Sequence, residues 1–208
     1  MTDIELTDEK TAFEVIDSLE VFRGNVFSMV SEQVKYRDGV ATRDFVKHPG
    51  AVAIVPLREG ANAPEVLLVH QYRHPVRAML WEVPAGLLDI EGEDPLQAAK
   101  RELAEEANLN AQRWDVLVDY FTTPGGSSES LRVFLARDLS QIPPAQRNFQ
   151  PREEEAFMTH RWVRLDEAVR AIYEGRIHNP SAVVGLLATQ HALATGQILR
   201  QPQASWLR

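Results

Sequence analysis

Three glutamates, Glu102, Glu105 and Glu106, stand close together in the segment 86–109 and give the sequence its first chemical signal. On an α-helix, residues three and four apart share a face, so these side chains would point within a sector of roughly 100°. Clustered carboxylates repel one another unless a cation lies among them, and Mg²⁺ prefers oxygen ligands of this kind. Arg101, four residues before Glu105, can neutralise part of the charge. The pattern predicts either a divalent-cation site or a solvated face whose acids pair with Lys or Arg.

The residues around these acids predict the helix that must position them. Asp94 can cap the first free N–H groups, and Pro95 suits the first helical position. A second stripe, displaced from the acids, is apolar and should pack on a sheet. It consists of Leu96, Ala99, Leu103 and Ala107.

The rest of the chain has a strand-rich front, further strand-like runs after the central helix, and helices at the end. Residues 13–46 indicate short extended segments, with a two-residue hairpin turn at Asp38-Gly39. Further strands are expected at 51–57, 65–73, 115–123, 131–137 and 160–165. Two helices follow, one ending at Gly175 and the other beginning at Asn179-Pro180. This order favours a mixed α/β sandwich.

Composition excludes several classes of protein. The 208 residues are 44% apolar and 25% charged, as in an ordinary globular domain, and the formal net charge of −8 argues against a nucleic-acid scaffold. The absence of cysteine excludes disulfides and thiolate metal sites. The N-terminus lacks the pattern of a signal peptide, and the longest apolar runs, such as 51–57, are too short to span a bilayer. We therefore expect a cytoplasmic protein with no membrane or nucleic-acid partner.

The segment 86–109 resembles the Nudix box, in which G, five residues, E and seven residues precede REUxEExGU, with U a bulky aliphatic residue. The matching positions are Gly86, Glu93, Arg101, Glu102, Leu103, Glu105, Glu106 and Leu109. Six residues rather than five separate Gly86 from Glu93, and Asn108 replaces the glycine of the motif. Both departures are tolerable, because a loop insertion costs little and Asn accepts the left-handed helix end.

This resemblance implies a Nudix-type mixed-sheet α/β/α sandwich with an N-terminal antiparallel β-layer. The layer would span 1–48 and the hydrolase domain 49–208. Mg²⁺, with Mn²⁺ as an alternative, would be held by the Ala85 carbonyl and by Glu102, Glu105 and Glu106. Arg101 would hold a glutamate in place. Two alternatives stay open: Gly86 as a plain turn glycine, and Glu93 as an ordinary loop acid near the helix start.

A second motif bears on the substrate. Pro124, fifteen residues beyond Leu109, lies in a PG…SE loop similar to that of Nudix enzymes selective for ADP-ribose; the other matching positions are Gly125, Ser128 and Glu129. Glu129 could accept hydrogen bonds from ribose hydroxyls. Arg73, in a QYRHP segment that also resembles this subgroup, would suit a pyrophosphate oxygen. The alternatives are an ordinary β-turn and a surface arginine.

The acidic run Glu153–Glu155 is the expected source of the catalytic base. In ADP-ribose pyrophosphatases that resemble this chain, a loop in this region supplies the catalytic glutamate, and Glu155 is the preferred candidate, Glu154 the second. Without the resemblance, the run would be a solvated charge cluster.

The resemblance as a whole implies Mg²⁺-dependent hydrolysis of ADP-ribose to AMP and ribose 5-phosphate. Alternatives are a Nudix pyrophosphatase for another nucleoside diphosphate sugar or a dinucleotide, and a non-catalytic ADP-ribose sensor. Similar enzymes are homodimers that exchange N-terminal strands. Phe22, Phe27 and Phe45 are candidates for that interface or for stacking on adenine, with core packing as the alternative.

Overall fold

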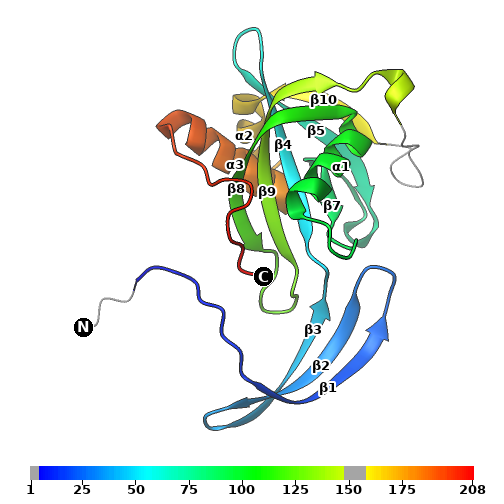
Figure 1. The fold of residues 1–208 in the computed structure, drawn as a ribbon, viewed down its shortest axis with the longest axis vertical. Helices are drawn as coiled ribbons and strands as arrows, with labels where there is room; N and C mark the ends of the chain where they lie inside the picture. Colours follow the sequence, from blue (N-terminus) through cyan, green and yellow to red (C-terminus); the bar gives the residue numbers. More distant parts are fainter. Residues whose placement is uncertain (1–4, 148–157) are drawn as a thin grey trace.

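A computed structural model describes residues 5–147 and 158–208 (Figure 1). The strands are β1 (Glu14–Arg23), β2 (Ser28–Tyr36), β3 (Gly39–Lys47), β4 (Ala51–Glu59), β5 (Pro64–Arg73), β6 (Ala78–Glu82), β7 (Ala85–Leu87), β8 (Leu109–Phe121), β9 (Ser130–Gln141) and β10 (Thr159–Arg164). The helices are α1 (Pro95–Ala107), α2 (Leu165–Tyr173) and α3 (Pro180–Thr195), with short 3₁₀ turns η1 (His74–Val76) and η2 (Pro144–Gln146). No helix within the described ranges is long and apolar enough to cross a membrane.

The strands form two separate sheets. Strands β1, β2 and β3 make an antiparallel meander, which lies below the rest of the molecule in Figure 1. The larger sheet has the order β10-β5-β4-β9-β8, with β6 paired to β5 and β7 paired to β4. Its β4–β9 pair is parallel while the neighbouring pairs are antiparallel, so the mixed sheet expected from the sequence is confirmed.

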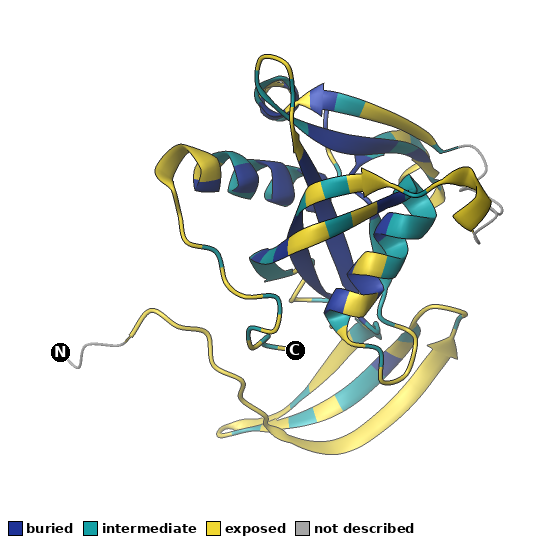
Figure 2. Ribbon diagram, turned by 45° about the horizontal axis from the view of Figure 1, so that its top comes forward, coloured by how far each residue is buried: buried dark blue, intermediate teal, exposed yellow. Residues whose placement is uncertain are grey.

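Strand β4 explains why helices cover both faces of the larger sheet. Its side chains alternate between faces, and both faces are buried. Ala53 and Val55 pack in the cluster that includes α2 and α3, whereas Val52 and Ile54 pack in the cluster beneath α1. Figure 2 shows this buried centre between the helices. The expected α/β/α sandwich is therefore confirmed.

The structure corrects the predicted position of the first hairpin turn. Tyr36 pairs with Gly39, so Arg37 and Asp38 form the two-residue connection between β2 and β3. Gly39, at φ +150°, instead begins the next strand. The hairpin was predicted, but its turn lies one residue earlier than Asp38-Gly39. Strands β6 and β7 were not predicted, because each is short and lies in a segment interrupted by Pro and Gly.

Burial of α3 provides a stability test with a control on the same helix. Leu186 is fully buried against the larger sheet, whereas Leu193 is 43% exposed. We predict that Leu186→Ala lowers the free energy of unfolding by about 2–5 kcal/mol, because it removes apolar contacts and leaves a cavity. Urea denaturation measures this change. Leu193→Ala should cost much less; equal losses for the two variants would contradict the packing described.

Candidate active site

Helix α1 carries the acidic residues and has well-defined ends. The Asp94 carboxylate accepts from the Leu96 N–H at 2.9 Å, and Pro95 occupies the first turn, which confirms the predicted start. Asn108 ends the helix in the left-handed conformation at φ 53°, and its N–H donates to the Ala104 carbonyl at 3.1 Å. Asn therefore replaces the motif glycine without changing the helix end.

Gly86 lets α1 approach the backbone of β7. A Cβ atom placed on Gly86 would lie 2.0 Å from both Cδ and Oε1 of Glu102, far inside any normal contact distance. Gly86 also pairs with Val52 of β4, so the backbone at this point cannot move away without breaking the sheet. Glycine therefore allows the Glu102 carboxylate to approach this backbone closely, whereas a side chain at position 86 would force Glu102 to shift.

Arg101 forms ion pairs with three carboxylates. It donates two hydrogen bonds to Glu93, both at 3.1 Å, and its Nη1 lies 2.5 Å from Glu102 Oε1 and 3.3 Å from Glu105 Oε2. The hydrogen bonds to Glu93, joined by the charge of Glu102, raise the pKa of Arg101 above its ordinary value, against the opposing effect of burial. The structure thus brings Glu93 to the acidic face in spite of the extra loop residue.

Glu106 connects the last turn of α1 to two strands. Its Oε2 accepts from the Ala85 N–H of β7 at 3.0 Å. Its backbone carbonyl lies 2.5 Å from Nε2 of His160 on β10. A carbonyl at a helix C-terminus lacks an intrahelical partner, so His160 satisfies a group that would otherwise be open. The contact to Ala85 brings together two residues that the sequence analysis assigned to one metal site.

The donor set fits a magnesium ion in its chemistry. Among the described residues, no group of three or more His, Asp or Glu side chains is already arranged around one point. Instead Arg101 draws Glu93, Glu102 and Glu105 towards itself, while Glu106 binds the backbone of β7. All these donors are oxygens, and the space that a Cβ of residue 86 would fill holds the Glu102 carboxylate. Hard oxygen ligands such as carboxylates are what Mg²⁺ prefers.

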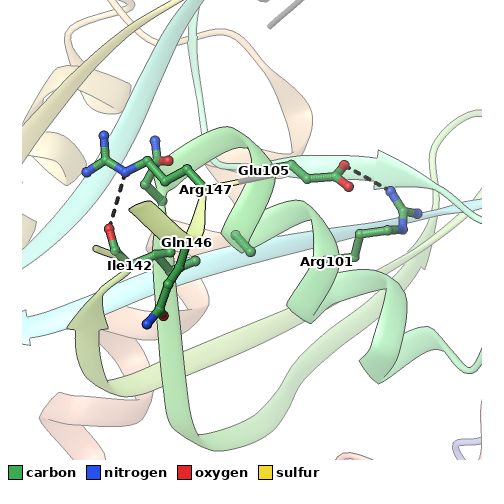
Figure 3. Close-up of a pocket in the computed structure, with 7 residues that line it drawn as sticks. Arg101, Glu105, Ile142, Gln146 and Arg147 are labelled. Carbon is green, nitrogen blue, oxygen red and sulfur yellow. Dashed lines mark hydrogen bonds and ion pairs between the residues drawn. The ribbon is translucent and has the colours of Figure 1, made fainter. Parts of the chain in front are cut away.

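A hollow of about 230 Å³ borders the same helix (Figure 3). It lies between α1, which contributes Arg101 and Glu105, and the segment after β9, which contributes Ile142, Gln146 and Arg147. Nε of Arg147 donates to the Ile142 carbonyl at 3.2 Å. The expected base residues Glu154 and Glu155, with Glu153, lie outside the described residues.

The Pro124 loop joins β8 to β9 and is hydrogen-bonded to the end of β3 and to the chain that follows it. The Ser128 N–H donates to the Val46 carbonyl, and the Val46 N–H to the Gly126 carbonyl, both at 2.9 Å. The Ser128 hydroxyl accepts from the His48 N–H at 3.0 Å. A Cβ on Gly125 would meet no atom within 4 Å, so Gly125 lies in open space. Ser128 therefore has a structural role that the sequence analysis missed.

Glu129 and Pro124 face different surroundings within this loop. The Glu129 carboxylate accepts from the Thr122 hydroxyl at 2.7 Å, and its other oxygen lies 3.8 Å from Nε2 of His48. Pro124 lines an open hollow of about 500 Å³ together with Phe121 and Pro49. The loop thus places Pro124, rather than Glu129, at this hollow of about 500 Å³, which is larger than the hollow beside α1.

Arg73 is held by a buried glutamate that the sequence analysis did not single out. Its Nε and Nη2 donate to Glu82 at 2.9 and 2.7 Å, and Nε2 of Gln71 also donates to Glu82 at 3.3 Å. Glu82 is 1% exposed, whereas the Arg73 side chain is 41% exposed. The one available signal was a charged residue inside the apolar run around Trp81 and Val83. The ion pair with the buried Glu82 therefore orients the partly exposed Arg73 side chain.

Comparisons with known proteins bear on the identity of the chain. Residues 47–183 match the family model described as NUDIX domain. An ADP-ribose pyrophosphatase of Mycobacterium tuberculosis is 43% identical over 197 residues, covering 94% of this chain and 91% of that relative. A methanol dehydrogenase activator of Bacillus methanolicus is 33% identical over 191 residues, covering 90% of this chain and 97% of the relative.

A solved structure agrees with the fold. The crystal structure of an ADP compounds hydrolase superposes with a TM-score of 0.72 at 19% identity, covering 91% of this chain and 98% of that one. At this level of identity the likeness concerns the fold alone. Taken with the match over residues 47–183 and with the acidic helix packed on Gly86, it leads to one conclusion: the chain belongs to the Nudix family.

Proposed function

We propose that the protein hydrolyses the pyrophosphate bond of ADP-ribose in a Mg²⁺-dependent reaction, producing AMP and ribose 5-phosphate. The observation that carries the proposal is the gathering of Glu93, Glu102 and Glu105 around Arg101, beside a backbone made accessible by Gly86. The 43% identical relative, named an ADP-ribose pyrophosphatase, supports the choice of substrate. The cytoplasmic location expected from the sequence stays a prediction.

The residues proposed to hold Mg²⁺ are Glu102, Glu105, Glu106 and the carbonyl of Ala85. When bound, the metal would supply charge neutralisation of the pyrophosphate and a more acidic water; Mn²⁺ is the alternative ion. Support comes from the all-oxygen donor set and from the hydrogen bond between Ala85 and Glu106. Arg101 would limit repulsion among the carboxylates and keep them on one side of α1.

Other side chains are proposed to bind and orient the substrate. Arg73, oriented by the buried Glu82, would donate to a pyrophosphate oxygen. The Pro124 loop, fixed by Ser128 to the chain before β4, would contact the nucleoside or ribose end, with Glu129 accepting from a ribose hydroxyl. A glutamate of the segment after β9, Glu155 or else Glu154, would take the proton of the attacking water. Most of the acceleration then comes from charge and positioning rather than from the base.

A substrate panel tests the proposal directly. We expect ADP-ribose to be cleaved to AMP and ribose 5-phosphate in the presence of Mg²⁺ and not after removal of divalent ions with EDTA. The panel should include other nucleoside diphosphate sugars and dinucleotides, because one relative of the chain is not named after any nucleotide substrate. A higher kcat/KM for another member of the panel would refute the assignment of ADP-ribose.

Two variants of α1 distinguish a loss of activity at the site from a general disturbance of the helix. Glu106→Gln should lower kcat roughly 100- to 1000-fold, since several kcal/mol of transition-state stabilisation depend on the metal site. Lys100→Gln, at an exposed position of the same helix, should retain normal activity. Circular dichroism and the unfolding midpoint of both variants check that α1 is intact. Near-normal turnover by Glu106→Gln would remove this residue from the site.

We also propose that the protein is a homodimer assembled through the sheet β1-β2-β3. Strand β1 is exposed along its whole length, and it presents large apolar side chains to solvent: Leu19 and Val21 are 61% exposed and Phe22 is 54% exposed. Several large apolar side chains exposed on one strand are unusual on a monomer and mark an interaction site. Figure 2 shows this sheet as mostly exposed, in contrast to the buried centre of the larger sheet. Exchange of N-terminal strands between subunits, as in similar enzymes, would cover it.

The proposed dimer can be tested by its mass in solution and by a substitution that should disrupt it. Size-exclusion chromatography with light scattering should give twice the 23.5 kDa of the chain. Phe22→Asp should shift the protein to the monomer, because it introduces a charge into the proposed apolar contact. Asp17→Asn, an exposed polar change on the same strand, should leave the dimer intact. A monomeric unsubstituted protein would contradict the proposal.

A further inference from the structure

The C-terminal segment, residues 197–208, follows a defined path from α3 to the loops of the larger sheet. Figure 1 shows it, in red, running beside β8 towards the hairpin end of β8 and β9. The Val116 N–H donates to the Arg200 carbonyl at 2.9 Å, and Nη1 of Arg200 donates to Asp119 at 2.9 Å. The segment is therefore attached to β8 by both backbone and side chain.

A buried arginine on β9 fixes the segment further along. Arg132 is 3% exposed, and it donates to the carbonyls of Ala204 at 2.8 Å and Ser205 at 3.0 Å. It also donates twice to Asp119, at 2.7 and 2.9 Å. A buried charge needs a full set of partners, and half of the set around Arg132 comes from the backbone of this segment. The arrangement holds residues 204 and 205 in one position.

Trp206 lies between Arg132 and Arg208 and contacts both guanidinium groups. The guanidinium carbon of Arg132 lies 4.9 Å from the centre of the Trp206 ring, and that of Arg208 lies 5.1 Å from it. Cations at such distances from an indole ring are attracted to it. The exposed Arg208 side chain is thereby supported by Trp206, which is itself placed by the buried Arg132.

Arg208 lines two hollows, each of which also has a lining residue near the proposed substrate site. One, of about 480 Å³, separates Trp206 and Arg208 from the loop before α1, including Ile90 and Glu93. The other, of about 500 Å³, separates Arg208 from His48 and Pro124. Glu93 shares Arg101 with Glu102, so the first hollow begins beside the acidic cluster. The second reaches the loop proposed to recognise ADP-ribose.

We propose that Arg208, supported by Trp206, is a substrate-binding residue for the nucleoside end of a nucleoside diphosphate sugar. The inference rests on the proposed function, because the pyrophosphate must lie at the glutamates of α1 and the rest of the molecule must extend away from them. A guanidinium donates to ribose hydroxyls and purine nitrogens and stacks on a planar base, so it suits a nucleoside. Within the described residues, no carboxylate forms an ion pair with Arg208, which keeps its donors for a ligand.

The test compares Arg208→Ala with Arg176→Ala, which removes an exposed arginine paired only with Glu174 in the described part of the chain. We expect Arg208→Ala to raise KM for ADP-ribose about fivefold or more while kcat stays within about twofold. Loss of binding shared by the ground state and the transition state has this signature. Arg176→Ala should change neither constant, and equal unfolding midpoints exclude a general loss of structure. An unchanged KM, or a fall in kcat alone, would overturn the assignment.

A binding measurement separates this inference from the proposed function. Calorimetric titration of ADP-ribose without divalent metal, so that no turnover occurs, should give a dissociation constant raised at least about fivefold by Arg208→Ala. Binding by the unsubstituted protein without hydrolysis in Mg²⁺ would refute the proposed reaction but leave the role of Arg208 intact. Equal binding by both proteins, or binding by neither, would refute the role of Arg208 alone, because the proposed contact is made to the nucleoside end and not through the metal.

Discussion

The close approach of α1 to β7 is the constraint on which the rest of the site depends. Carboxylates on one helix face repel each other. They stay together here because Arg101 binds Glu102 and Glu105 of α1, and Glu93 of the loop before it, while the Ala85 N–H binds Glu106. Gly86 allows this approach, since a Cβ at this position would overlap the Glu102 side chain and force it to shift. The buried face of α1, centred on Leu103, holds the helix against the sheet at this distance. The contact between α1 and β7 thus depends on the packing of Leu103, on the absence of a side chain at Gly86 and on the ion pairs of Arg101. The proposed chemistry depends on this contact.

Features encoded within a few residues could be predicted from the sequence. The start of α1 at Asp94 and Pro95, its end at Asn108 and its apolar stripe depend on local hydrogen bonding and helical periodicity. The acidic face needed only the 3.6-residue repeat. The family resemblance added the larger sheet and its two helical layers, which the fold confirms. By contrast, the hairpin turn before Gly39 was placed one residue late, because pairing of β2 with β3 rather than the Asp-Gly signal sets its register.

Features that depend on contacts between distant residues could not be predicted. Nothing near Arg73 in the sequence shows that its charge is paired with a buried Glu82, because the pairing of β5 with β6 creates that contact. Likewise, nothing near Arg132 in the sequence shows that it binds the backbone of the C-terminal segment. Ser128 was assigned to substrate recognition from its motif, yet in the fold it binds the backbone of His48. In each case the polar group makes a tertiary contact that composition and periodicity do not encode.

Binding of Mn²⁺ in the absence of nucleotide tests the central claim most directly, since it asks whether these carboxylates hold a divalent ion at all. Electron paramagnetic resonance of free Mn²⁺ during titration gives the affinity without relying on any substrate. The account predicts saturable binding by the unsubstituted protein, and at least a tenfold weaker affinity (roughly 1.4 kcal/mol) when Glu102 and Glu106 are both replaced by Gln. Equal affinities of the two proteins for Mn²⁺ would contradict it.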